Sequence, residues 1–114
     1  MTRAHQHLRR LLAGGLIEGR RPRWTHALSL MKAVSDERSA ESEALLREVA
    51  LFDGKLLLDE EAGLPHAMSP EDMLRSLAAQ TLAKWDRRRH RDVIRQVSRT
   101  ASSGLATAIV RRWV

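Results

Sequence analysis

Ser69-Pro70-Glu71-Asp72 carries the clearest folding signal in this chain. A serine caps the free N–H groups at the start of a helix, a proline suits the first helical position, and acids in the first turn favour the helix dipole. The sequence therefore predicts a helix that begins at residue 70. Its expected buried face comprises Met73, Leu74, Leu77, Ala78, Leu82 and Trp85.

This helix would be unusually long if it continued to Arg99, because Val93, Ile94 and Val97 resume an apolar face beyond residue 92. At 1.5 Å per residue it would measure about 45 Å. A domain of this size has a radius of gyration of about 13 Å. The helix over about 70–99 must therefore either cross the whole body and protrude, or break near residues 86–92.

Apolar residues at helical spacing predict further helices on both sides of this one. The expected ranges are about 4–13, 26–34, 40–52 and, after the long helix, 102–112. Gly14 is expected to end the first helix, Thr25 to cap the second and Ser39 to cap the third.

Asp53-Gly54 has two interpretations. Asp-Gly between apolar runs is a signal for a β-hairpin, but neither flanking run alternates as a strand would. We favour a helix stop at Gly54, then a short helix or turn over 56–58, and a loop over 59–68.

The fold class that follows is all-α, a single-domain bundle of four to six helices over residues 1–114. The composition, 43% hydrophobic and 30% charged, suits a globular protein. The absence of cysteine excludes disulfides, thiolate metal sites and a cysteine nucleophile. No apolar run approaches the ~18 residues of a membrane span, and a signal-peptide pattern is missing, so we expect a cytoplasmic protein without membrane contact.

Charge is segregated along the chain. Residues 1–34 carry seven Lys/Arg against one acid, residues 35–72 carry three against eleven, and residues 73–114 carry ten against two. Like charges held together repel, so each block needs an opposite charge or solvent to offset it. The two basic blocks favour a polyanion such as nucleic acid, and the acidic segment 35–72 favours protein partners or self-association.

The densest basic run is Asp86-Arg-Arg-Arg-His-Arg-Asp92. Successive helical residues are turned by about 100°, so these arginines cannot share one helix face. We expect them to meet phosphates; a solvated turn or pairing with the acidic block are the alternatives. The candidate nucleic-acid-binding residues are Arg87, Arg88, Arg89, Arg91 and Arg95, and secondarily Arg20, Arg21 and Arg23.

Trp24 follows the second arginine group and either stacks on a base or packs in the core. We expect the two arginine groups to gather into one surface that attracts phosphates.

Motifs for catalysis are missing from the sequence. It has no His-Glu-x-x-His, no Gly-x-Ser-x-Gly, no phosphate-cradling glycine loop and no EF-hand spacing. A helix-turn-helix over 73–85 and 93–99 would lack the usual glycine in its turn. We therefore expect no catalytic residue, no metal and no cofactor.

The function we expect is that of a non-catalytic helical subunit that contacts the phosphate backbone of DNA or RNA within a larger nucleoprotein complex. The build is similar to that of CRISPR effector small subunits and phage packaging subunits, although no motif links the chain to a family. The alternatives are an adaptor or inhibitor that binds an acidic protein surface, and a self-assembling structural subunit.

Overall fold

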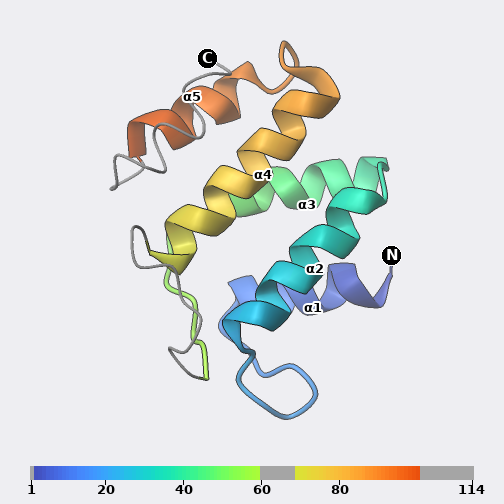
Figure 1. The fold of residues 1–114 in the computed structure, drawn as a ribbon, viewed down its shortest axis with the longest axis vertical. Helices are drawn as coiled ribbons and strands as arrows, with labels where there is room; N and C mark the ends of the chain where they lie inside the picture. The colour runs from blue at the N-terminus through green and yellow to red at the C-terminus, as the bar shows by residue number, and fades with distance from the viewer. Residues whose placement is uncertain (1, 60–68, 101–114) are drawn as a thin grey trace.

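The computed structural model describes residues 2–59 and 69–100, which form five α-helices and, apart from one bridged residue pair, no β-structure (Figure 1). The helices are α1 (Arg3–Leu12), α2 (Trp24–Asp36), α3 (Ala40–Ala50), α4 (Pro70–Asp86) and α5 (Arg91–Thr100). The predicted all-α fold is confirmed. The helix expected over 102–112 lies outside the described residues.

The third helix, α3, is the one around which the others pack. It contacts α1, α2, α4 and α5, and its interface with α4 is the most extensive. Figure 1 shows α3 crossing behind α4, with α5 toward the top of the view and α1 toward the bottom. One buried apolar cluster joins all five helices, and it includes Leu8, Val34, Leu46, Leu82 and Ile94.

A buried histidine adds a polar link between α1 and α3. His5 is 1% exposed, and its Nε2 atom shares a hydrogen bond of 2.8 Å with the hydroxyl of Ser42. Its Nδ1 atom lies 2.5 Å from the hydroxyl of Thr2. Both ring nitrogens therefore have partners, which a buried imidazole needs.

Local sequence signals predicted the residues that cap three helix ends. The backbone N–H groups of Ser42 and Asp72 donate to the hydroxyl oxygens of Ser39 and Ser69, both at 3.1 Å. Gly14 follows the end of α1 with a φ of 76°, a left-handed conformation that glycine adopts without strain. The predicted roles of Ser39, Ser69 and Gly14 are confirmed.

The predicted cap at Thr25 is wrong, because α2 already begins at Trp24. Arg23 precedes the first turn in an extended conformation, with φ −87° and ψ 158°, and no side chain caps the helix. Trp24 is only 3% exposed, so packing of its ring in the core sets the start of the helix. The same burial excludes stacking of Trp24 on a base.

The favoured helix stop at Gly54 is also wrong, because α3 ends at Ala50 and residues 51–59 form neither a helix nor a hairpin. Gly54 has a different role, which is to let the chain approach an aromatic ring. A Cβ atom at this position would lie 2.9 Å from the ring of Phe52, closer than side chains pack.

Side chains from the start of α4 hold this irregular segment. The N–H group of Leu56 donates to the carboxylate of Glu71 at 3.0 Å, and Arg75 donates to the carbonyl of Phe52 at 2.9 Å. Arg75 also pairs with Asp72. Of the two acids that mark the start of the helix in the sequence, Glu71 therefore makes a tertiary contact, while Asp72 pairs within α4 with the arginine that holds Phe52.

The long helix predicted over about 70–99 is interrupted at the place the sequence indicated. α4 ends at Asp86 and α5 begins at Arg91. The carboxylate of Asp86 accepts the N–H group of Arg89 at 3.1 Å, a contact typical of a turn that an aspartate begins. Beyond the turn, the apolar face resumes with Val93, Ile94 and Val97, each 1% exposed.

Leu46→Ala should lower the free energy of unfolding by about 2–5 kcal/mol, because it leaves a cavity at the centre of the core. Leu46 is 0% exposed, whereas Leu51, just after the same helix, is 49% exposed. Leu51→Ala is the matched control, with an expected loss within about 0.5 kcal/mol. Urea denaturation followed by circular dichroism measures both, and equal losses would contradict the central position of α3.

Candidate nucleic-acid interface

Most candidate residues of the C-terminal block lie within residues 86–92, which span the end of α4, the turn and the start of α5 and which we call the basic turn. Arg95 lies further along α5. The side chains of Arg87, Arg88, Arg91 and Arg95 are exposed. Within residues 2–59 and 69–100, none of these four guanidinium groups forms an ion pair or a hydrogen bond. They are therefore available to an external anion.

Arg89 behaves differently from its neighbours in the basic turn. Its Nε atom lies 2.7 Å from Oε1 of Glu43, on α3. This pairing with the acidic block was one of the alternatives for the whole arginine run, and among the described residues it is realised at Arg89. A phosphate would have to compete with Glu43 for this guanidinium.

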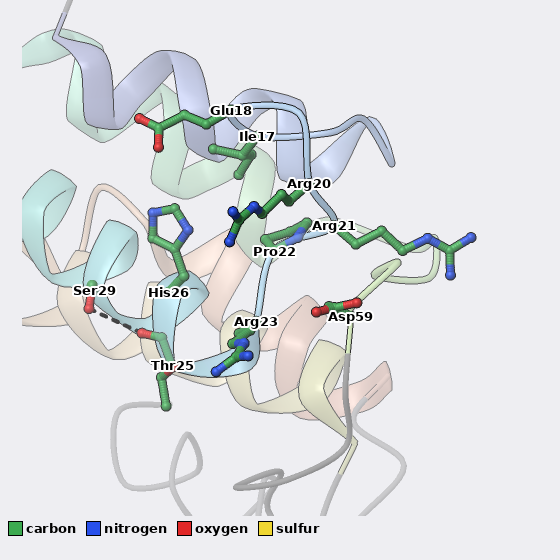
Figure 2. Close-up of a pocket in the computed structure, with 10 residues that line it drawn as sticks. All are labelled: Ile17, Glu18, Arg20, Arg21, Pro22, Arg23, Thr25, His26, Ser29 and Asp59. Carbon is green, nitrogen blue, oxygen red and sulfur yellow. Dashed lines mark hydrogen bonds between the residues drawn. The ribbon is translucent and has the colours of Figure 1, made fainter.

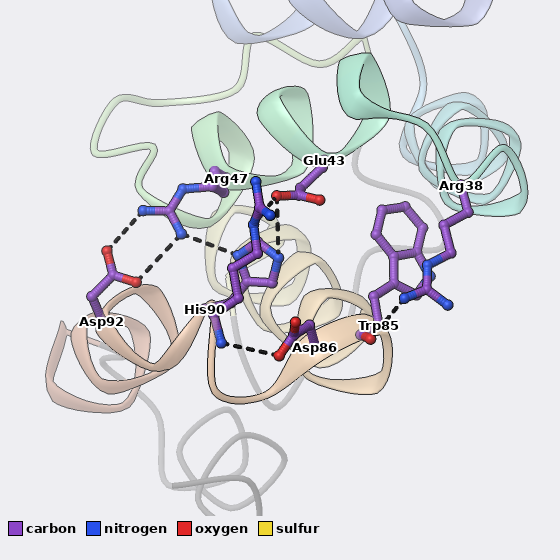
Figure 3. Close-up of polar contacts among 8 residues, drawn as sticks. Arg38, Glu43, Arg47, Trp85, Asp86, His90 and Asp92 are labelled. Atoms are coloured by element: carbon purple, nitrogen blue, oxygen red, sulfur yellow. Dashed lines mark hydrogen bonds and ion pairs between the residues drawn. The ribbon is translucent and has the colours of Figure 1, made fainter.

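The side chain of His90, which belongs to the basic turn, points into the protein and is 1% exposed (Figure 3). A guanidinium can only donate hydrogen bonds, and Nη1 of Arg47 lies 3.1 Å from Nδ1 of His90. The imidazole must therefore accept at Nδ1 and is neutral, with its proton on Nε2. That atom lies 3.6 Å from Oε1 of Glu43.

The pKa of His90 is lowered from its ordinary value. Burial is the main cause, since it disfavours the charged imidazolium. The carboxylate of Glu43 acts in the opposite direction, the guanidinium groups of Arg47 and Arg89 lower the pKa further, and Asp86 raises it slightly.

Arg47 also binds the far end of the basic turn through two parallel contacts. Its Nη2 and Nη1 atoms donate to the two carboxylate oxygens of Asp92, at 2.7 and 3.3 Å (Figure 3). The hydrogen bonds that Arg47 donates hold the pKa of Asp92 below its ordinary value, and the same contacts raise the pKa of Arg47. The turn is thus fixed from beneath while its other arginines point outward.

Sequence reasoning missed Glu43 and Arg47 as parts of this site. Their spacing of four residues places them on one face of α3, which is a detectable signal. The partners of Arg47, however, lie 43 and 45 residues further along the chain, at His90 and Asp92. Nothing in the local sequence indicates that pairing.

The second arginine group lies between α1 and α2, on residues 13–23, which we call the arginine loop. Ile17 donates its N–H group to the carbonyl of Arg20 at 2.8 Å, and Arg20 donates to Ile17 at 3.1 Å. Between them, Glu18 and Gly19 have φ angles of 52° and 77°. Two consecutive positive φ angles are typical of the tight turn that joins paired strands.

A pocket of about 620 Å³ opens beside the arginine loop (Figure 2). Arg20, Arg21 and Arg23 line it together with the first turns of α2 and with Asp59. Pro22 is buried between two exposed arginines, so its ring holds this part of the loop against the core while Arg21 and Arg23 face solvent.

The structure does not bring the two arginine groups together, contrary to the expectation of one surface. Figure 1 shows the connection between α1 and α2 at the bottom of the long axis and the connection between α4 and α5 at its top. This axis measures 39 Å. The intervening helices separate the groups into two surfaces.

The acidic block partly neutralises the chain's own bases. Nη1 of Arg9 lies 2.6 Å from Glu48, and Nζ of Lys32 lies 2.8 Å from Asp36. Exposed pairs of this kind each contribute only about 0–1 kcal/mol. They orient side chains more than they stabilise the fold.

Comparisons with known proteins give no further guidance, because no family model, no curated protein and no solved structure matches this chain. In the described ranges, no group of three or more His, Asp or Glu side chains is placed to hold a metal ion. None of the helices there combines the length and the apolar character that crossing a bilayer requires.

The lowered pKa of His90 predicts a loss of stability in mild acid. As the pH falls below about 6.5, the ordinary value, the unfolded chain takes up the proton before the folded protein does, so the free energy of unfolding decreases. Asp92 acts in the same direction, but only below its ordinary value of 3.8. Urea denaturation at about pH 7 and about pH 5 measures the effect.

His90→Gln keeps an acceptor for Arg47 and cannot take up the proton. Its stability should therefore change less between these two pH values than that of the wild type. A titration of His90 by NMR that gives a pKa above 6.5 would contradict the interpretation.

Proposed function

We propose that this protein is a non-catalytic subunit of a nucleoprotein complex and that it binds the phosphate backbone of nucleic acid through the basic turn. The observation that carries the proposal is the exposure of Arg87, Arg88 and Arg91, whose side chains have no carboxylate partner among the described residues. Guanidinium groups bind phosphate oxygens through paired hydrogen bonds. A cytoplasmic location is part of this proposal.

The exposed face of α5 extends this surface. Arg91, Arg95 and Arg99 follow one another at intervals of four residues, so they share one side of the helix. Val93, Ile94 and Val97 occupy the buried side. Arg99 was not among the sequence candidates, although its spacing from Arg95 indicates this position. A stripe of cations on a packed helix suits a continuous polyanion.

Pre-organisation supports the same interpretation. Arg47 holds both His90 and Asp92, so the backbone that carries the outward arginines is already fixed. Binding then costs less ordering of the chain than it would on a free loop. Contacts with phosphates fix position and do not read sequence, so we propose binding that depends little on base identity.

Protein contacts within the complex are assigned to the acidic segment 35–72 in this proposal. Glu43 and Glu48 are bound to bases of the same chain. Glu37 and Asp53 have exposed side chains that a basic partner surface would reach.

Nucleic-acid affinity should fall steeply with salt, because binding releases the cations condensed on the phosphates. If four phosphates are neutralised, raising the salt from about 50 to about 200 mM weakens duplex binding roughly 100-fold. Arg87→Gln with Arg88→Gln should lower the slope of log affinity against log salt by about 1.8, or about 0.9 per lost contact. Fluorescence anisotropy with generic DNA and RNA measures both quantities.

The matched control is Lys32→Gln with Lys55→Gln, which removes the same charge from exposed positions away from the basic turn. This control should keep most of the wild-type slope. No binding at about 50 mM salt, or equal effects of the two double variants, would overturn the proposal. Salt-dependent oligomers that form without nucleic acid would favour a self-assembling subunit. Binding of this protein to an acidic protein surface, in place of nucleic acid, would favour an adaptor.

Releasing Arg89 should strengthen binding. Glu43→Gln removes the carboxylate that lies 2.7 Å from Nε of Arg89, so this guanidinium becomes available to phosphate. We expect a gain in affinity of about two- to fivefold, which corresponds to one exposed ion pair. Glu48→Gln, which frees Arg9 on α1 instead, should change the affinity less. The anisotropy assay at low salt compares the two variants, and equal gains would mean that only net charge matters.

A further inference from the structure

The pocket beside the arginine loop is large enough for more than a single ion. Its volume of about 620 Å³ falls in the range of roughly 300–1,000 Å³ that is typical of small-molecule sites. A phosphate alone would fill a small fraction of this space, and a phosphate attached to a sugar and a base would fill a larger share of it.

One part of the lining suits a phosphate group. Arg20 and Arg23 both line the pocket, and Figure 2 shows the side chain of Arg20 turned toward His26, while Arg21 extends away at the rim. Within the described residues, the guanidinium of Arg20 has no ion pair or hydrogen bond. The hydroxyl of Thr25 adds a further donor at the wall. The guanidinium of Arg20 can bind two oxygens of a phosphate through paired hydrogen bonds.

The rest of the lining suits the other parts of a nucleotide. Glu18 and Asp59 also line the pocket, and their carboxylates would repel a bare anion. Carboxylates accept hydrogen bonds from sugar hydroxyls and from amino groups of bases. The ring of His26 is held in an edge-to-face contact with His7, at 6.3 Å between centroids, and imidazole rings can stack on bases. The mixed lining therefore favours a phosphate that carries a polar, aromatic substituent.

The walls of the pocket are already ordered. The paired contacts between Ile17 and Arg20 fix the hairpin, and the carbonyl of buried Pro22 accepts the N–H group of Asp59 at 3.0 Å. This last contact joins the arginine loop to the segment after α3. A pre-formed site loses little conformational freedom when a ligand enters it.

We infer that this pocket binds a nucleoside phosphate, either as the terminal nucleotide of a strand or as a free nucleotide. Assigning the pocket to the terminal nucleotide of a strand rests on the proposed function, because it requires the protein to bind a strand. Assigning it to a free nucleotide does not. In both cases Arg20 contacts the phosphate, and the pocket acts separately from the basic turn at the other end of the molecule.

Isothermal titration calorimetry with adenosine 5′-monophosphate and uridine 5′-monophosphate tests the site directly. The wild type should bind at least one nucleotide more tightly than it binds adenosine or inorganic phosphate. Arg20→Gln should weaken nucleotide binding about tenfold or more, because a charge-assisted contact is lost. Arg10→Gln is the matched control, since it removes one exposed arginine of α1 that does not line the pocket, and it should leave nucleotide binding unchanged.

Three results would overturn the inference: no nucleotide binding at millimolar concentration, equal binding of nucleotides and inorganic phosphate, or wild-type nucleotide binding by Arg20→Gln. Circular dichroism verifies that each variant is folded.

Oligonucleotides with a 5′-phosphate or a 5′-hydroxyl distinguish the two sources. Tighter binding of the phosphorylated strand, lost in Arg20→Gln, assigns the pocket to a strand end. Equal binding of both strands, with the nucleotide response intact, assigns it to a free nucleotide. Failure of the proposed function would be seen in a different experiment. The double variant Arg87→Gln with Arg88→Gln would then have the same salt slope as the wild type.

Discussion

Arg47 joins α3 to the chain beyond α4 at two points, the Nδ1 atom of His90 and the carboxylate of Asp92. These contacts span the basic turn, so one side chain sets the position of the backbone between the two helices. They also determine the proton on His90, because a guanidinium partner requires a neutral imidazole. The backbone that carries the outward arginines is held in place by these contacts.

The order of charge in the sequence becomes a different pattern once the helices pack. Acids of α3 form ion pairs with arginines of both basic blocks. Glu48 pairs with Arg9 of α1, and Glu43 pairs with Arg89 of the basic turn. Part of the acidic block therefore offsets the protein's own basic residues. Exposed arginines remain in the basic turn and in the arginine loop. Positive charge of this kind attracts anions.

The sequence predicted those features that depend on a few neighbouring residues. The caps at Ser39 and Ser69 and the interruption between α4 and α5 follow from local chemistry. The helix ends that were predicted wrongly depend on residues distant in the sequence. Burial of Trp24 sets the start of α2, and Glu71 holds the segment after α3. For the candidate site, charge density indicated the exposed arginines, but their supports on α3 and their division between two ends required the fold.

The separation of the arginine loop from the basic turn along the 39 Å axis has a consequence for stoichiometry. If both surfaces bind nucleic acid as proposed, they make the protein a divalent linker and not a clamp. When nucleic acid is in excess, such a linker can bridge two strands or two remote stretches of one strand and so compact them. When protein is in excess, each surface becomes saturated separately, and the bridges dissolve.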